Sequence, residues 1–221
     1  MNPSASPDRR ARQAKPPWSA DAPIVAIDLA SVETYFLVRA LSGLAVEKEG
    51  AVWCPLRSEP ARLDLDIESA RLHAKRLQLP FVRPERHPAP VPRAMRIAAL
   101  AAARGHGAIF VLRATRLAWA TGADLNRLGD GGTPEDPDLE DDPDGYLRLM
   151  MQEIGFTVDE AKLAAEEGSS WDAELRSLAD GLARLGVHAA PALRWRGEVH
   201  TGLLAISAVL AECEDPQPTL D

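Results

Sequence analysis

The sequence predicts an α/β fold in which a strand–helix–strand unit and a hairpin–helix unit enclose a long helical block. Three observations carry this prediction. A short apolar run rich in β-branched residues is followed by a helical pattern and then by a second apolar run. A long stretch of helical periodicity comes next. The chain then closes with two short apolar runs around a tight turn, followed by a last helix. This order favours a sheet covered by helices.

The opening unit begins at residues 23–29, whose apolar side chains predict a buried strand. Apolar residues recur at helical spacing over residues 32–44, and residues 46–56 predict the second strand. The second strand contains Cys54, but position 57 is an arginine, so the two positions cannot form a redox pair. We therefore expect the Cys54 thiol to be buried and inert.

The middle of the chain reads as a series of helices separated by Pro and Gly. The pattern predicts helices over residues 67–79, 93–104, 108–121, 146–154, 158–167 and 171–185. Residues 80–92 predict an extended connector, and Thr157 with Glu160 forms a capping-box pattern. The closing unit follows, with strands at 192–195 and 198–201 around Arg196-Gly197 and a helix over 203–212.

Composition bounds the classes of function. The 221 residues carry a net charge of −8, which argues against nucleic acid as the main partner. No apolar run reaches the ~20 residues of a membrane helix, and the polar, Pro-rich N-terminus predicts a cytoplasmic protein. The two cysteines lie far apart and the five histidines lack metal-ligand spacing, so we expect no disulfide framework and no metal.

The same patterns predict the domain organisation. Residues 1–22 predict a disordered tail and residues 214–221 a second tail. Residues 23–57 and 186–213 would form one domain, and residues 58–185 a helical insertion with an acidic loop over 129–145. A thioredoxin-like fold interrupted by a helical insertion has this layout, because two pieces distant in sequence would then share one sheet.

Three stretches carry a resemblance to a known family. Residues 28–35 (DLASVETY) are similar to the turn D-x-x-S-P-[FY]-S-Y of the 2-hydroxychromene-2-carboxylate isomerases and the kappa-class glutathione transferases. Residues 71–84 (RLHAKRLQLPFVRP) are similar to that family's helix and the following G-[IL]-P-[LF]-x-x-P. Residues 185–191 (LGVHAAP) resemble x-G-V-x-G-V-P before the last hairpin. Together the stretches span nearly the whole predicted folded chain in the family's order.

The resemblance implies a DsbA-like thioredoxin fold and a glutathione-dependent isomerase or transferase that acts on a small apolar or aromatic substrate. In the family, the first serine of the turn binds the glutathione sulfur, which makes Ser31 the expected catalytic residue. Pro191 matches a cis proline, and the backbone of Ala190 would pair with the thiol ligand. Gly202 matches the glycine that follows the hairpin, so we expect it at the same site. The family also implies a homodimer.

The chemistry expected of Ser31 is physically reasonable. A hydroxyl at a helix N-terminus can donate to a thiolate, and the helix dipole favours the same negative charge. The structural alternative is that Ser31 only caps its helix. Pro191 has a corresponding alternative, an ordinary trans proline at the start of a strand.

The sequence also departs from the family. Val32, Glu33 and Thr34 replace the Pro, aromatic and second Ser of the turn. Leu203 and Leu204 replace a polar residue and the Asp that contacts the amino end of glutathione. Two functions therefore stay open, a thiol-dependent enzyme and a non-catalytic thioredoxin-like binding protein that has lost glutathione binding. We expect Ser31 and Ala190 to border one pocket, with Leu203 and Leu204 as its apolar wall.

Overall fold

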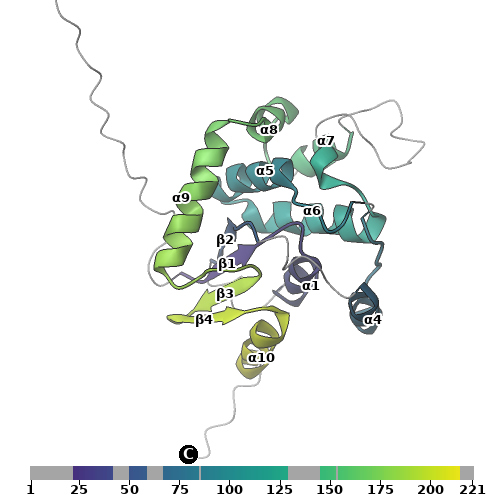
Figure 1. The fold of residues 1–221 in the computed structure, drawn as a ribbon, viewed down its shortest axis with the longest axis vertical. Coiled ribbons are helices and arrows are strands. Elements are labelled where there is room, and N and C mark those ends of the chain that lie inside the picture. The colour runs from purple at the N-terminus through teal and green to yellow at the C-terminus, as the bar shows by residue number, and fades with distance from the viewer. Residues whose placement is uncertain are drawn as a thin grey trace, which may run out of the picture.

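The computed structural model describes residues 22–41, 50–58, 67–84, 86–128, 145–152 and 154–214 (Figure 1). Most of the predicted tails and of the predicted acidic loop, namely residues 1–21, 129–144 and 215–221, lie outside this set. The predicted domain boundaries therefore stay predictions.

A mixed four-stranded sheet lies at the centre of the described chain. Its strands are β1 (Ile24–Ile27), β2 (Val52–Pro55), β3 (Ala192–Trp195) and β4 (Glu198–Thr201), in the spatial order β2-β1-β3-β4. β1 pairs parallel with β2 and antiparallel with β3, and β3 pairs antiparallel with β4. The first and last parts of the chain therefore share one sheet, as the α/β thioredoxin-like prediction requires.

Helices make up most of the remaining described structure. They are α1 (Val32–Leu41), α4 (Ile67–Arg76), α5 (Pro92–Ala103), α6 (Gly107–Thr121), α7 (Gly145–Gln152), α8 (Val158–Ala165), α9 (Ser170–Arg184), α10 (Leu203–Glu214) and the short 3₁₀ helix η1 (Leu125–Arg127). The helices α5, α6 and α9 contact β2, whereas α10 lies against β3, β4 and α1 (Figure 1). The sheet is thus covered by helices from both the middle and the end of the chain.

The element boundaries differ from the predicted ones where side chains or glycines end an element. The strand predicted at 23–29 stops at Ile27, because the following Asp28 side chain accepts the Ala30 N–H and turns the chain. Of the strand predicted at 46–56, residues 46–49 lie outside the described residues, and β2 covers Val52–Pro55, after Gly50 at φ +76°. The capping box of Thr157 and Glu160 is present as predicted.

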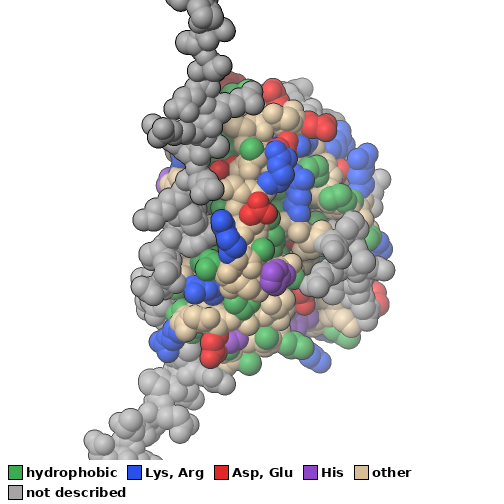
Figure 2. Space-filling view, turned by 60° about the vertical axis from the view of Figure 1, so that its left-hand side comes forward, with side chains coloured by type: hydrophobic (Ala, Val, Ile, Leu, Met, Phe, Trp, Pro, Cys, Tyr) green, Lys and Arg blue, Asp and Glu red, His purple; other side chains and the backbone are tan. Residues whose placement is uncertain are grey.

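The core is mostly apolar, and the surface carries charges of both signs. All four residues of β1 are fully buried, and α1 has seven buried residues out of ten. Figure 2 shows Lys and Arg side chains interleaved with Asp and Glu over the face that it presents. Among the described residues, no helix combines the length and apolar character needed to cross a bilayer.

The packing of α6 on the sheet yields a test of the fold. Gly107 begins α6, and a Cβ placed there would lie 2.8 Å from the Cβ of Trp53 in β2. Gly107→Val should lower the free energy of unfolding by about 1–3 kcal/mol through overpacking. The neighbouring Ala108→Val is the control and should cost clearly less. Equal costs in denaturant titrations would contradict this contact.

Candidate functional site

The carboxyl ends of β1 and β2 bring the predicted site residues to one edge of the sheet. Because these strands are parallel, the segments that follow them, residues 28–31 and 56–58, leave the sheet at the same edge. The antiparallel ladder places Ala26 opposite Ala192. Extending this register by two residues brings Asp28 opposite Ala190. Segments distant in sequence therefore meet beside the start of α1.

A buried carboxyl group holds this edge together. Asp28 is 4% exposed, and its Oδ1 accepts the Ala30 N–H at 2.9 Å while its Oδ2 accepts the Ser58 N–H at 2.7 Å. The Asp28 N–H donates to Oγ1 of Thr34 at 3.3 Å. Burial raises the pKa of this carboxyl, although the two backbone N–H bonds act in the opposite direction. One side chain thus fixes both loops.

The peptide between Ala190 and Pro191 is cis, as predicted. The Ser58 hydroxyl donates to the Ala190 carbonyl at 3.4 Å, which links the loop after β2 to this peptide. The Gly202 N–H donates to the Pro191 carbonyl at 2.9 Å, so this amide holds the start of α10 against the proline. Gly202 therefore lies beside Pro191, but its N–H already has an acceptor.

Ser31 directly precedes α1 and is 4% exposed. Its carbonyl accepts the Thr34 N–H at 3.1 Å, and its own N–H donates to the Asp28 carbonyl at 3.0 Å. Its hydroxyl makes no hydrogen bond with any described residue. The backbone of Ser31 thus fixes the turn, and the side chain does not cap the helix. The role predicted for the hydroxyl in binding a thiol stays a prediction.

A second carboxylate comes from the first turn of α1. Glu33 accepts a hydrogen bond from the Leu203 N–H at the start of α10. Partial burial raises the pKa of Glu33, and the Leu203 bond lowers it. Leu203 and Leu204 replace the polar residue and the Asp of the family, but the Glu33 carboxylate lies at the N-terminus of α10. It is supplied by the neighbouring helix.

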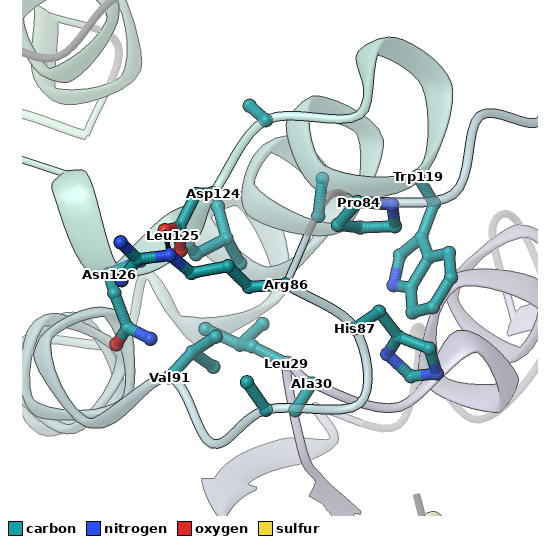
Figure 3. A pocket seen from close by; sticks show the side chains of 13 residues that line it. Leu29, Ala30, Pro84, Arg86, His87, Val91, Trp119, Asp124, Leu125 and Asn126 are labelled. Atoms are coloured by element: carbon teal, nitrogen blue, oxygen red, sulfur yellow. Dashed lines mark hydrogen bonds and ion pairs between the residues drawn. The ribbon is translucent and has the colours of Figure 1, made fainter. Parts of the chain in front are cut away.

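The expected pocket between Ser31 and Ala190 is not reproduced in the cavity next to the turn. That cavity measures about 20 Å³ and is lined by Leu29 and Ala30, together with His87, Trp119 and residues 123–126 (Figure 3). Neither Ser31 nor Ala190 lines it. A space of this size holds about one water molecule.

The walls of this small cavity include buried polar atoms. The Trp119 Nε1 and the Asn126 Oδ1 have no hydrogen-bond partner among the described residues. His87 packs edge-on against Trp119, with ring centroids 4.7 Å apart. A water or a small polar group of a ligand would satisfy these atoms. The sequence pattern did not single them out.

Two further expectations can be compared with the structure. Leu203 is buried but Leu204 is 85% exposed, so the two do not form one apolar wall as predicted. Helical geometry explains the difference, because consecutive residues of α10 point in different directions. The Cys54 thiol is buried, as expected, and burial raises its pKa to about 12, which disfavours the reactive thiolate.

Sequence reasoning missed two residues of the site. Ser58 connects Asp28 to Ala190, and its position just after the second predicted strand of a β-α-β unit was the available signal. Glu33 was noted only as a departure from the family turn. Within the described ranges, no three His, Cys, Asp or Glu side chains come together in a way that could hold a metal ion.

The Asp28 hydrogen bonds predict a stability change. Asp28→Asn keeps the size of the side chain but turns an NH₂ group toward one of the two N–H donors. The free energy of unfolding should fall by about 1–3 kcal/mol. Thermal or denaturant unfolding measures the change. An unchanged stability would show that the carboxyl does not hold the two loops.

The raised pKa of Asp28 sets the sign of a pH effect. A raised folded-state pKa means that the folded protein keeps this proton while the unfolded chain loses it above the ordinary value of 3.8. The stability difference between wild type and Asp28→Asn should therefore be largest below that value. It should shrink as the pH rises toward the folded-state pKa. A difference that grows with pH would contradict the burial of Asp28.

The comparisons with known proteins concern the fold. No protein-family model and no curated protein matches the sequence. A solved structure of a 2-hydroxychromene-2-carboxylate isomerase matches with a TM-score of 0.61 at 15% identity, covering 90% of this chain and 98% of that chain. The chain therefore has the DsbA-like thioredoxin fold of that isomerase, with the helical insertion, as the sequence resemblance predicted.

Proposed function

We propose that the protein is a thiol-dependent isomerase or transferase that uses glutathione or a similar thiol and acts on a small apolar or aromatic molecule. The observation that carries this proposal is the Ser31 hydroxyl. It lies at the N-terminus of α1, at the edge that also holds the cis Ala190–Pro191 peptide, and has no partner among the described residues. The match to an isomerase structure supports the reaction class.

The residues of the edge suit a bound thiolate. The Ser31 hydroxyl would donate to the sulfur, and the N-terminus of α1 would stabilise its negative charge. Bound glutathione would supply a thiolate that adds to an activated double bond, so that the resulting single bond rotates before elimination. The buried Asp28 frame would keep Ser31 in place. The described turn offers no cysteine at 31 or 34, which argues against disulfide exchange.

Glu33 fits the other end of glutathione. In the family turn this position is not acidic, and the acid lies at the residue matching Leu204. Here the Glu33 carboxylate lies at the N-terminus of α10, where it is half-buried. A carboxylate there would accept the γ-glutamyl ammonium group. We infer that Glu33 supplies the charge partner that Leu203 and Leu204 no longer provide.

A second candidate function is a thioredoxin-like binding protein without catalysis. The observation that favours it is the cavity beside the turn, whose volume of about 20 Å³ is too small for an aromatic substrate. Turnover of an activated alkene or hydroxychromene carboxylate with glutathione would favour the enzyme. We further expect a homodimer, on the resemblance alone, and a cytoplasmic location, on the composition of the sequence.

Replacement of Ser31 tests the proposed thiol site. Ser31→Ala should weaken glutathione binding roughly 10- to 100-fold in calorimetry, because a hydrogen bond to a charged sulfur contributes about 1.5–3 kcal/mol. The free energy of unfolding should change by less than about 0.5 kcal/mol, because the hydroxyl has no described partner to lose. Ser177→Ala on the exposed face of α9 is the control. If the wild type does not bind glutathione, the glutathione site is contradicted and the second candidate function, a binding protein without catalysis, is favoured.

The role of Glu33 is tested by comparing two thiols. Glu33→Gln should weaken glutathione binding about 10-fold while leaving the binding of 3-mercaptopropionate, which lacks the ammonium group, unchanged. Because the pKa of Glu33 is raised, the wild-type preference for glutathione should fade as the pH drops toward that pKa. The variant should show no such dependence. An equal loss for both thiols would exclude the ammonium contact.

A further inference from the structure

A cleft with paired arginines lies between the end of β2, the start of α5 and the end of α8. Its volume is about 390 Å³, and its lining includes Arg57, Pro92, Arg93, Arg96, Ala165 and Glu167. This volume falls within the range of small-molecule sites. It greatly exceeds the space beside the Leu29–Ala30 turn. The cleft shares neither Ser31 nor Ala190 with the thiol site.

Arg96 is a buried cation that is only partly satisfied by the protein. Its side chain is 8% exposed. Its Nε donates to the Asp172 carboxylate at 2.8 Å, and its Nη1 donates to the Ala165 carbonyl at 2.9 Å. A guanidinium carries five N–H groups, and the others have no acceptor among the described residues. Burying a cation with unused donors favours a site that an anion completes.

Arg57 and Arg96 share a single carboxylate. Nη2 of Arg57 lies 3.5 Å from Oδ1 of Asp172, the same oxygen that accepts from Arg96. The other Asp172 oxygen accepts the Gly168 N–H at 2.9 Å. Arg93 and Glu167 also line the cleft, so three positive charges face two negative charges and an excess of one positive charge remains there. Arg57 is 48% exposed and can turn toward a ligand.

The start of α5 adds to the positive potential at the cleft. Val91 provides no side-chain cap, and Pro92 occupies the first turn of the helix. The N–H groups at the start of the helix and its dipole therefore point positive charge toward the cleft beside Pro92 and Arg93. This helix end supports the arginine pair and would not define a site alone.

We propose that this cleft binds the carboxylate or phosphate group of a small molecule, with Arg57 and Arg96 as the residues that contact the anion. Bidentate guanidinium contacts suit a pair of oxygens of a carboxylate or a phosphate group. The proposal goes beyond the thiol chemistry and does not depend on it. It predicts that the protein recognises an anionic ligand even when no thiol is present.

The test titrates the full-length protein with succinate and, separately, with inorganic phosphate at low ionic strength. Nuclear magnetic resonance of the arginine Nε–H groups in the wild type should show saturable shifts for Arg57 and Arg96. By calorimetry, Arg57→Gln should weaken binding about 10-fold. The control Arg71→Gln, a 63% exposed cation on α4 paired with Glu68, should leave it unchanged. Ser31→Ala should bind succinate like the wild type, which separates this site from the thiol site.

The outcomes are distinct. Saturable binding of either anion, together with weaker binding by Arg57→Gln, supports the site. The anion that binds more tightly shows whether the site prefers a carboxylate or a phosphate group. Absence of saturable shifts at both arginines overturns the proposal, and this result requires no variant to fold. Equal affinity of Arg57→Gln and Arg71→Gln would also overturn it, because binding would then reflect surface charge in general.

Discussion

The buried carboxyl group of Asp28 is the constraint on which the arrangement of the site depends. An acid in a core is unfavourable unless its oxygens are hydrogen-bonded, and here the two oxygens accept N–H groups from two different loops. The end of β1 cannot move away from the end of β2 without leaving a buried carboxyl unsatisfied. The start of α1 is fixed as a consequence, and Ser31 with it.

The same edge is closed from the other side by the end of the chain. Ser58 contacts the Ala190 carbonyl, Gly202 contacts the Pro191 carbonyl, and Glu33 contacts the Leu203 N–H. These contacts join the opening and closing units of the sheet without a disulfide or a described metal site. Most backbone N–H and C=O groups of this edge are hydrogen-bonded to one another. The Ser31 hydroxyl has no partner among the described residues, so it is available to donate to a ligand.

The sequence predicted most of the frame because its signals are local. Apolar runs located β1 and β3, the capping box located α8, the family turn located Ser31, and the stretch before the last hairpin located Pro191. The contact of Glu33 with Leu203 could not be predicted, because it depends on how α1 and α10 pack against each other. The burial of Arg96 could not be predicted for a similar reason. The helical pattern around it does not indicate that this cation packs against Asp172 of α9. Within the described residues, the second strand is shorter than predicted, because the turn at Gly50 was not weighed.

We propose that the edge formed by Ser31, Glu33 and the Ala190–Pro191 peptide receives a thiol. Backbone amide resonances of the wild-type protein, followed during a glutathione titration, test this claim directly. The predicted result is a saturable change at residues 31, 33 and 190, with residues of the exposed face of α9 unaffected. Absence of change at these amides, or saturable change confined to other parts of the chain, would contradict it.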